Sequence, residues 1–382
     1  MQEILFLLLP IAFYSGWQAA RKRYKQRQEK RKEISVSFVK GINYLLSEQP
    51  DKALDVFLNY PEIDEYTVET FLLLGNLFRN RGEVNRALRV HQNLVARADL
   101  SKAQRMAGML ALGEDFFSAG MLDRAESVFT ELLKEDPKHI EACEALRNIY
   151  EQLHEWEKAI EIAECAQRYG KNDHSRLIAH YYCELALLEL HKNNLFLAEE
   201  HIKRAVNAYP ASARVLVLRG DLAYARNQRA EALTAYQQAI THDSRLLGML
   251  FQHLISHFRQ PGELEQLYAF VHETFSKTQD TRLFAYLLQL AEKLKQLPQM
   301  REQVEKHLQQ GKTTLNTITH SADVLVSLWQ KEQICDLPLL QTALHRLAAT
   351  QPEFQCSHCG YKMHDYLWRC PACHQWDTVG NV

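Results

Sequence analysis

The chain has 382 residues, of which 46% are hydrophobic and 24% charged, with only 14 glycines and 10 prolines. This composition excludes an extensively disordered chain, because enough apolar surface is present to form a core. Residues 21–32 hold eight Lys and Arg against one Glu, which leaves 37 basic and 46 acidic side chains in the rest of the chain. The acidic remainder argues against nucleic acid as a partner, since phosphate contacts need clustered cations.

An uncharged apolar stretch lies near the N-terminus, at residues 4–17. Together with the next three residues it reaches the lower limit of about 17 residues for a membrane-spanning helix. The basic block follows the apolar stretch, whereas in a cleaved signal peptide it would precede it. We therefore predict a single-pass anchor in a cell membrane at residues 1–20 and a basic juxtamembrane segment at 21–34. The positive-inside bias would leave the bulk of the chain cytoplasmic and the N-terminus on the other side. A buried terminal helix is the alternative.

The middle of the chain repeats one small pattern. Six alanines mark it at separations of 34, 38, 34, 39 and 34 residues: Ala53, Ala87, Ala125, Ala159, Ala198 and Ala232. Twelve residues before most of these alanines lies another small residue: Gly41, Gly75, Gly113, Ala186 and Gly220. Four residues after most of them comes an apolar side chain, with His91 as the departure. Small residues at a helix crossing let two helices approach closely while large residues interlock around them.

This period and pattern resemble the tetratricopeptide repeat. We predict an all-α, superhelical tetratricopeptide-repeat solenoid with six repeats at residues 35–243 and degenerate helical repeats at 244–350. In such repeats the inner surface comes mainly from the first helix of each pair. Candidate partner-binding residues on that surface are Asn76, Arg79, Glu114, Asn148, Arg214, Asp221 and Tyr224. For each of them an ordinary solvated helix face is the alternative.

Four of the eight cysteines lie close to the C-terminus. Cys356, Cys359, Cys370 and Cys373 form two C-x2-C pairs separated by ten residues. Two such turns can place four thiolates at the corners of a tetrahedron around one metal ion. We predict a four-cysteine metal-binding module at residues 351–382. Four protein ligands leave no open position for a substrate, so the metal is either structural or redox-active.

The spacing alone does not decide between iron and zinc. The sequence from Cys370 to Cys373, with its Pro371, and the aromatic residues around it resemble a shortened rubredoxin, which implies iron; a zinc ribbon fits equally well. We expect the module to pack on the last helices through Trp368 or Trp376. The other cysteines, Cys143, Cys165, Cys183 and Cys335, are predicted to be isolated and buried as small hydrophobic residues.

No catalytic motif is complete. Gly311 to Thr313 lacks the first glycine and the preceding strand of a phosphate-binding loop. His253 and His257 lie one turn apart, but no glutamate follows His253 as in a metalloprotease helix. The adjacent Asp173, His174 and Ser175 cannot form a triad with one another. We therefore expect no enzymatic activity.

An apolar anchor, a repeat solenoid and a terminal four-cysteine module, in this order, resemble the lipopolysaccharide assembly protein B family. The resemblance implies an inner-membrane adaptor that presents the lipid A deacetylase LpxC to the membrane protease FtsH for degradation. It also implies regulation by a membrane sensor of the same pathway. The alternative is a membrane-tethered scaffold for lipopolysaccharide enzymes or transporters without a role in proteolysis. Self-association into a homo-oligomer is left open.

Overall fold

The computed structural model describes residues 49–58, 65–278, 281–309, 315–329, 344–347 and 351–381, with eleven further single positions. These positions are Tyr14, Trp17, Gln18, Arg21, Lys22, Lys40, Gly41, Asn43, Tyr44, Ser47 and Thr342. The predicted anchor and juxtamembrane segment therefore lie largely outside the described residues, as do Gly311 to Thr313 and Cys335. Within the described part of the chain, no helix combines the length and the apolar character that crossing a membrane requires.

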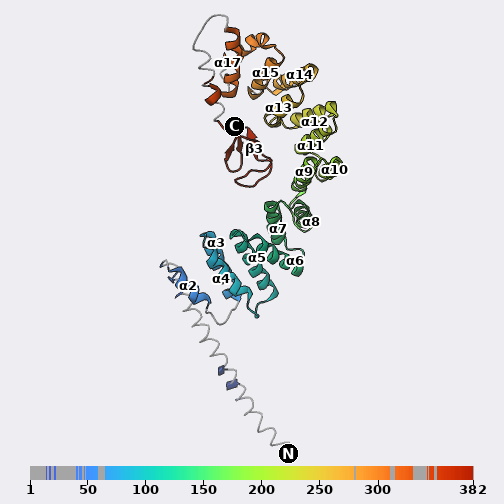
Figure 1. Cartoon of the computed structure of the whole chain (residues 1–382). Helices are drawn as coiled ribbons and strands as arrows, with labels where there is room; N and C mark the ends of the chain where they lie inside the picture. The colour runs from blue at the N-terminus through green and yellow to red at the C-terminus, as the bar shows by residue number, and fades with distance from the viewer. Residues whose placement is uncertain are drawn as a thin grey trace, which may run out of the picture. The chain divides into compact units, whose positions relative to one another are not determined.

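The chain divides into two compact units, residues 1–174 and 175–382. The described part of unit 1 is helical, and its helices with described bounds are coloured blue to green in Figure 1. They are α2 (Pro50–Leu58), α3 (Glu65–Asn80), α4 (Val84–Val95), α5 (Lys102–Ser118), α6 (Leu122–Glu135), α7 (Ile140–Leu153) and α8 (Trp156–Tyr169). Consecutive helices α3 and α4, α5 and α6, and α7 and α8 pack as pairs. The predicted helical-repeat fold is confirmed.

Unit 2 continues the pairs and ends in a small sheet. Its helices with described bounds are α9 (Ser175–His191), α10 (Leu195–Ala208), α11 (Ala213–Ala225), α12 (Arg229–His242), α13 (Leu246–His257), α14 (Pro261–Thr278), α15 (Thr281–Lys293), the 3-10 helix η1 (Leu297–Met300), α16 (Arg301–Gln309) and α17 (Leu315–Trp329). The strands β1 (Phe354–Cys356), β2 (Lys362–Met363) and β3 (Val379–Asn381) form an antiparallel sheet in the order β2-β1-β3.

The tight turns inside the pairs share one backbone feature. A residue with positive φ lies at each of five of them: Gly82, Gly120, His154, Asn193 and Asn227. Glycine and asparagine tolerate this left-handed conformation better than other residues, and it ends a helix by turning the chain back. These turns set each second helix against the first.

The alanine column packs as expected, because all six of its members are fully buried. A Cβ added to Gly113 would lie 2.4 Å from the ring of Phe129, and one added to Gly220 would lie 2.6 Å from the ring of Tyr236. Each glycine on a first helix therefore receives a large side chain from the second helix. This is the close approach that the sequence pattern predicts.

His91, the departure from the pattern, takes the place of the aromatic ring over Gly75, where an added Cβ would lie 2.2 Å from its Nε2. His91 Nδ1 lies 2.6 Å from Oδ2 of Asp115, and both side chains are fully buried. Arg79 donates to Oδ1 of the same carboxylate at 2.7 Å. A buried polar group needs a hydrogen-bond partner, so His91 explains why Asp115 can be buried, and Asp115 explains the same for His91.

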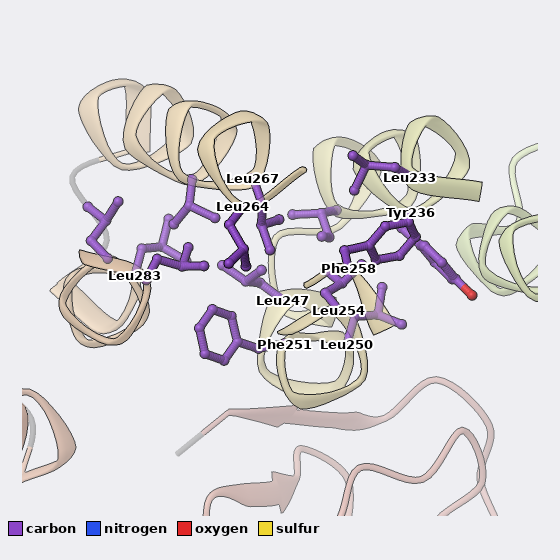
Figure 2. Close-up of a cluster of buried hydrophobic side chains, with 14 of the residues drawn as sticks. Leu233, Tyr236, Leu247, Leu250, Phe251, Leu254, Phe258, Leu264, Leu267 and Leu283 are labelled. Carbon is purple, nitrogen blue, oxygen red and sulfur yellow. The ribbon is translucent and has the colours of Figure 1, made fainter. Parts of the chain in front are cut away.

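The largest hydrophobic cluster of unit 2 runs from α11 to α17. In Figure 2, Leu250, Phe251 and Leu254 of α13 lie near Leu264 of α14 and Leu283 of α15. The alanine column ends at Ala232 of α12, and the helices from α13 onward instead bury leucine and phenylalanine side chains against one another. Burial of this kind stabilises the late helices without the small-residue crossings of the earlier repeats.

Candidate metal centre

The four C-terminal cysteines lie on two turns of similar geometry. In the first turn, Gly360 N donates to Cys356 O at 2.9 Å, and Gly360 has φ of 76°. In the second turn, His374 N donates to Cys370 O at 2.9 Å, and His374 has φ of 58°. The residue after the second cysteine of each pair thus adopts the left-handed conformation. Each turn brings its two thiols to the same side.

The four Sγ atoms all lie within 4.8 Å of one another. The distances from Cys356 to Cys373 and from Cys359 to Cys370 are both 3.7 Å. A tetrahedral thiolate site with metal–sulfur bonds of about 2.3 Å has sulfur–sulfur edges of about 3.8 Å. The cysteines therefore fit a single tetrahedral metal ion, as the sequence predicts.

One ligand has a polar neighbour that favours the thiolate. The hydroxyl of Thr378 lies 3.2 Å from Cys356 Sγ. This hydrogen bond lowers the pKa of Cys356 to about 6, against the opposing effect of burial, and the backbone near Cys359 and His358 adds to it. A metal requires the deprotonated sulfur, so the Thr378 hydroxyl assists metal binding.

The module is held on α9 by a carboxylate that follows the second cysteine pair. Asp377 Oδ2 accepts hydrogen bonds from Arg176 Nε at 2.7 Å and from His180 Nε2 at 2.6 Å. Burial raises the pKa of Asp377, but the hydrogen bond from His180 and the charge and hydrogen bond of Arg176 outweigh it and leave the pKa below 3.8. Burial lowers the pKa of His180 below 6.5, despite the opposing effect of Asp377. Neutral His180 can donate its Nε2 proton to the ionised carboxylate.

Contacts of the tryptophan rings attach the metal module to α11 as well as to α9. The Trp376 ring stacks on His180 with centroids 4.7 Å apart. The guanidinium of Arg214 lies 5.6 Å from the centroid of Trp368 and 5.6 Å from that of Trp376. Arg214 also donates to Glu184 at 2.8 Å and is only 5% exposed. A guanidinium over two rings gains cation–π attraction that grows as water is excluded.

This arrangement corrects our prediction that the module packs on the last helices. Trp376 and Trp368 do make the contact, as expected, but the side chains that hold them belong to α9 and α11. Trp368 also packs against the large hydrophobic cluster of unit 2. The reason is chemical. His180 of α9 binds the Asp377 carboxylate and stacks on Trp376, and Arg214 of α11 lies against both indole rings.

The predicted partner-binding residues have different surroundings. Arg79 Nη2 donates to Glu114 at 2.6 Å, so these two candidates pair with each other across α3 and α5. Arg214 is covered by the metal module. Asn148 is exposed on α7, and Asn76 is half-buried on α3.

The remaining two candidates join a polar cluster in unit 2. The Tyr236 hydroxyl donates to Asp221 at 2.7 Å and lies 3.2 Å from Nε2 of His253. Tyr224 meets the ring of His257 edge to face, with centroids 4.7 Å apart. The two histidines stack on each other at 4.0 Å, so both take part in side-chain packing.

Two cysteines that we predicted to be isolated are in fact neighbours. Cys143 Sγ and Cys165 Sγ lie 3.7 Å apart, on α7 and α8. The repeat pattern could have revealed this contact, because the start of the first helix of a pair lies beside the end of the second helix. Cys183 is fully buried, as predicted.

The matches to protein families agree with both parts of the structure. Residues 354–381 match the rubredoxin metal binding domain family. Residues 171–331, 116–179 and 70–103 match tetratricopeptide repeat families. Among solved structures, the crystal structure of MamA protein is 18% identical and superposes with a TM-score of 0.34 over 47% of this chain and 94% of its own.

Curated relatives match this chain along its full length. The protein named lipopolysaccharide assembly protein B from Escherichia coli strain K12 is 33% identical over 381 residues, which are 99% of this chain and 98% of that protein. The protein of the same name from Haemophilus influenzae strain Rd is 30% identical over 402 residues, covering 100% of this chain and 98% of its own. Identity at this level over whole chains shows that the protein belongs to the lipopolysaccharide assembly protein B family.

Proposed function

We propose that this chain acts in lipopolysaccharide assembly as a non-enzymatic inner-membrane adaptor, which limits synthesis by presenting LpxC to FtsH for degradation. The observation that carries the proposal is whole-length membership of a family whose curated members are named for lipopolysaccharide assembly. The partners themselves follow from the family resemblance. A repeat solenoid suits the task because its extended surface can hold a client.

The metal centre supports a role without catalysis. All four corners of the tetrahedron are cysteine thiols, so a bound ion has no position for a substrate. The ion would instead hold residues 354–381 folded, and Trp376 and Asp377 follow Cys373 closely. Metal binding therefore positions the side chains that dock on α9 and α11. We propose iron, by likeness to rubredoxin, with zinc as the alternative; metal analysis and a visible absorption band that bleaches on reduction distinguish them.

Membrane attachment would supply the proximity that an adaptor needs. Tethering an adaptor and a membrane protease to one bilayer raises their effective concentration without any new contact. We propose that residues 1–20 provide this tether, with the N-terminus in the periplasm and the repeats in the cytoplasm. The composition of residues 4–17 and the basic block after them support this orientation.

The exposed inner surface is the proposed client site. Arg214 is already buried by the metal module, and Arg79 and Glu114 satisfy each other. Asn148 on α7 remains exposed, so the first helices of unit 1 are the better candidates for client contact. Replacing Asn148 by Lys would disturb such a contact without touching the core.

The test is the half-life of LpxC after translation is blocked, in cells with and without this chain. A sharply longer half-life in its absence is expected. The N148K variant should lengthen the half-life partly, while an exposed substitution on the outer helix α6, Glu131→Lys, serves as the matched control. An unchanged half-life in the deletion strain would contradict the adaptor role.

A scaffold that gathers lipopolysaccharide proteins without proteolysis is the second candidate, favoured by the word assembly in the names of the relatives. It predicts an unchanged LpxC half-life together with loss of co-purifying biosynthesis or transport proteins in the N148K variant.

A further inference from the structure

Two thiols outside the metal centre lie side by side in unit 1. Cys143 is in the first turn of α7 and Cys165 is near the end of α8, and their Sγ atoms are 3.7 Å apart. These helices pack directly on each other and are joined by the turn at His154, so the thiols lie at the opposite, open end of the pair. The packing of one repeat therefore fixes their proximity.

The separation is close to what a disulfide requires. A sulfur–sulfur bond is about 2.05 Å long, so the two atoms must approach by about 1.6 Å. Rotation about the Cα–Cβ bonds moves each Sγ on an arc of comparable size. Because α7 and α8 already hold the two sulfurs 3.7 Å apart, side-chain rotation is the first movement that the bond requires.

The two thiols differ in access. Cys143 is 1% exposed, whereas Cys165 is half-buried, and its Sγ lies 3.7 Å from the carbonyl oxygen of Pro137 at the surface. Burial first, and then the neighbouring Cys165, Glu144 and Asp136, together raise the pKa of Cys143 to about 12. An oxidant in solution would meet Cys165 first, because Cys143 stays protonated and covered.

We propose that Cys143 and Cys165 form a reversible disulfide when the chain meets a peroxide. Cys165 sulfur attacks hydrogen peroxide, which gives a sulfenic acid at Cys165 and one water. Cys143 sulfur then attacks the sulfenic sulfur; its proton leaves with the hydroxyl group as a second water. Two thiols are oxidised and one peroxide is reduced. A dithiol reductant reverses the bond by exchange.

The bond would close the open end of this repeat. It would link the start of α7 to the end of α8, whose other ends are already joined by the turn at His154. The pair would then be tied at both ends, which limits sliding of α7 against α8. Asn148, the exposed candidate for client contact, lies on the restrained helix.

The test uses the full-length, metal-loaded chain treated with hydrogen peroxide, quenched, alkylated and mapped by mass spectrometry without reduction. The expected product is a peptide pair that links Cys143 to Cys165, is lost after dithiothreitol and is unchanged in the Cys183→Ser control. Free thiols at both positions, after a dose that oxidises glutathione in the same tube, would overturn the proposal. So would a sulfinic acid at Cys165 beside an unmodified Cys143.

Single variants test the order of the steps. Cys143→Ser should leave Cys165 as a sulfenic acid that dimedone traps, while Cys165→Ser should leave Cys143 unlabelled. Each variant is compared by circular dichroism with the parent, so that a misfolded protein is recognised. If dimedone labels Cys143 in a folded Cys165→Ser protein, the proposed order is wrong.

Discussion

Asp377 accepts a 2.6 Å hydrogen bond from His180, a residue 197 positions earlier in the sequence. This one contact joins the end of the chain to the first helix of unit 2. It lies beside the stacking of Trp376 on the same histidine ring. The metal module is therefore part of the solenoid surface of unit 2.

Replacing Asp377 by Ala should weaken this attachment by about 2 kcal/mol, because a charged hydrogen bond is lost and His180 is left buried without its acceptor. Urea denaturation followed by tryptophan fluorescence measures the change, since Trp368 and Trp376 both report on the contact. Asp365→Ala, at an exposed position of the same module, is the matched control. Equal midpoints for the two variants would show that the contact contributes nothing.

Removing the metal should detach the module. A strong chelator at neutral pH is expected to unfold residues 354–381 and to shift tryptophan emission to longer wavelength as the indoles enter water. The helical signal in the circular dichroism spectrum should decrease only slightly, because the cysteine ligands lie outside the helices. Cys370→Ser should reproduce the shift without chelator, and Cys183→Ser should not. Retention of the parent emission in C370S would contradict a structural metal.

Gly113→Ala should destabilise unit 1 by about 1–3 kcal/mol, since the new Cβ would lie 2.4 Å from the Phe129 ring and force it to move. Gly262→Ala is the control, because nothing lies within 4 Å of a Cβ at that position. Its effect should stay within about 0.5 kcal/mol. Chemical denaturation of both variants checks the difference, and equal losses would refute the close crossing of α5 and α6.

Stability should fall on mild acidification because of His307. Its side chain is buried and stacks on Phe284 at 4.3 Å, and burial lowers its pKa below 6.5. Below pH 6.5 the unfolded state takes up a proton that the folded state resists, so the free energy of unfolding decreases as pH falls toward the folded-state pKa.

His307→Leu should flatten that pH dependence between about pH 6.5 and 5. Denaturation midpoints measured across this range provide the check, with His272→Gln, at an exposed position of α14, as the comparison. A parent-like slope in H307L would assign the acid sensitivity to other groups.

The sequence predicted those features that recur or that have fixed spacing. The alanine column located the crossings because every repeat must meet the same steric demand, and the cysteine spacing located the ligands because only short turns bring two sulfurs to one ion. The rubredoxin-like module and the repeats are both confirmed by the family matches.

The docking of the module escaped prediction because no local pattern encodes it. Asp377, His180 and Arg214 are ordinary polar residues, and only the packing of α11 beside α9 brings His180 and Arg214 together under Trp376. The pairing of Arg79 with Glu114 is not predictable for a related reason: the repeat pattern places both on the inner surface but does not show that the two side chains form an ion pair there.

The contact between Asp377 and His180 also sets an order of events during synthesis. At about 5–20 residues per second, the ribosome adds the 197 residues from His180 to Asp377 in about 10–40 s, and within that time α9 and α11 are complete before the side chains that cover them have been made. His180 and Arg214 therefore stay open to solvent and to chaperones throughout elongation. Because we expect the metal to hold residues 354–381 folded, a chain can close this face only after these residues have been made and have bound the ion, so the contact would distinguish mature protein from nascent or truncated protein.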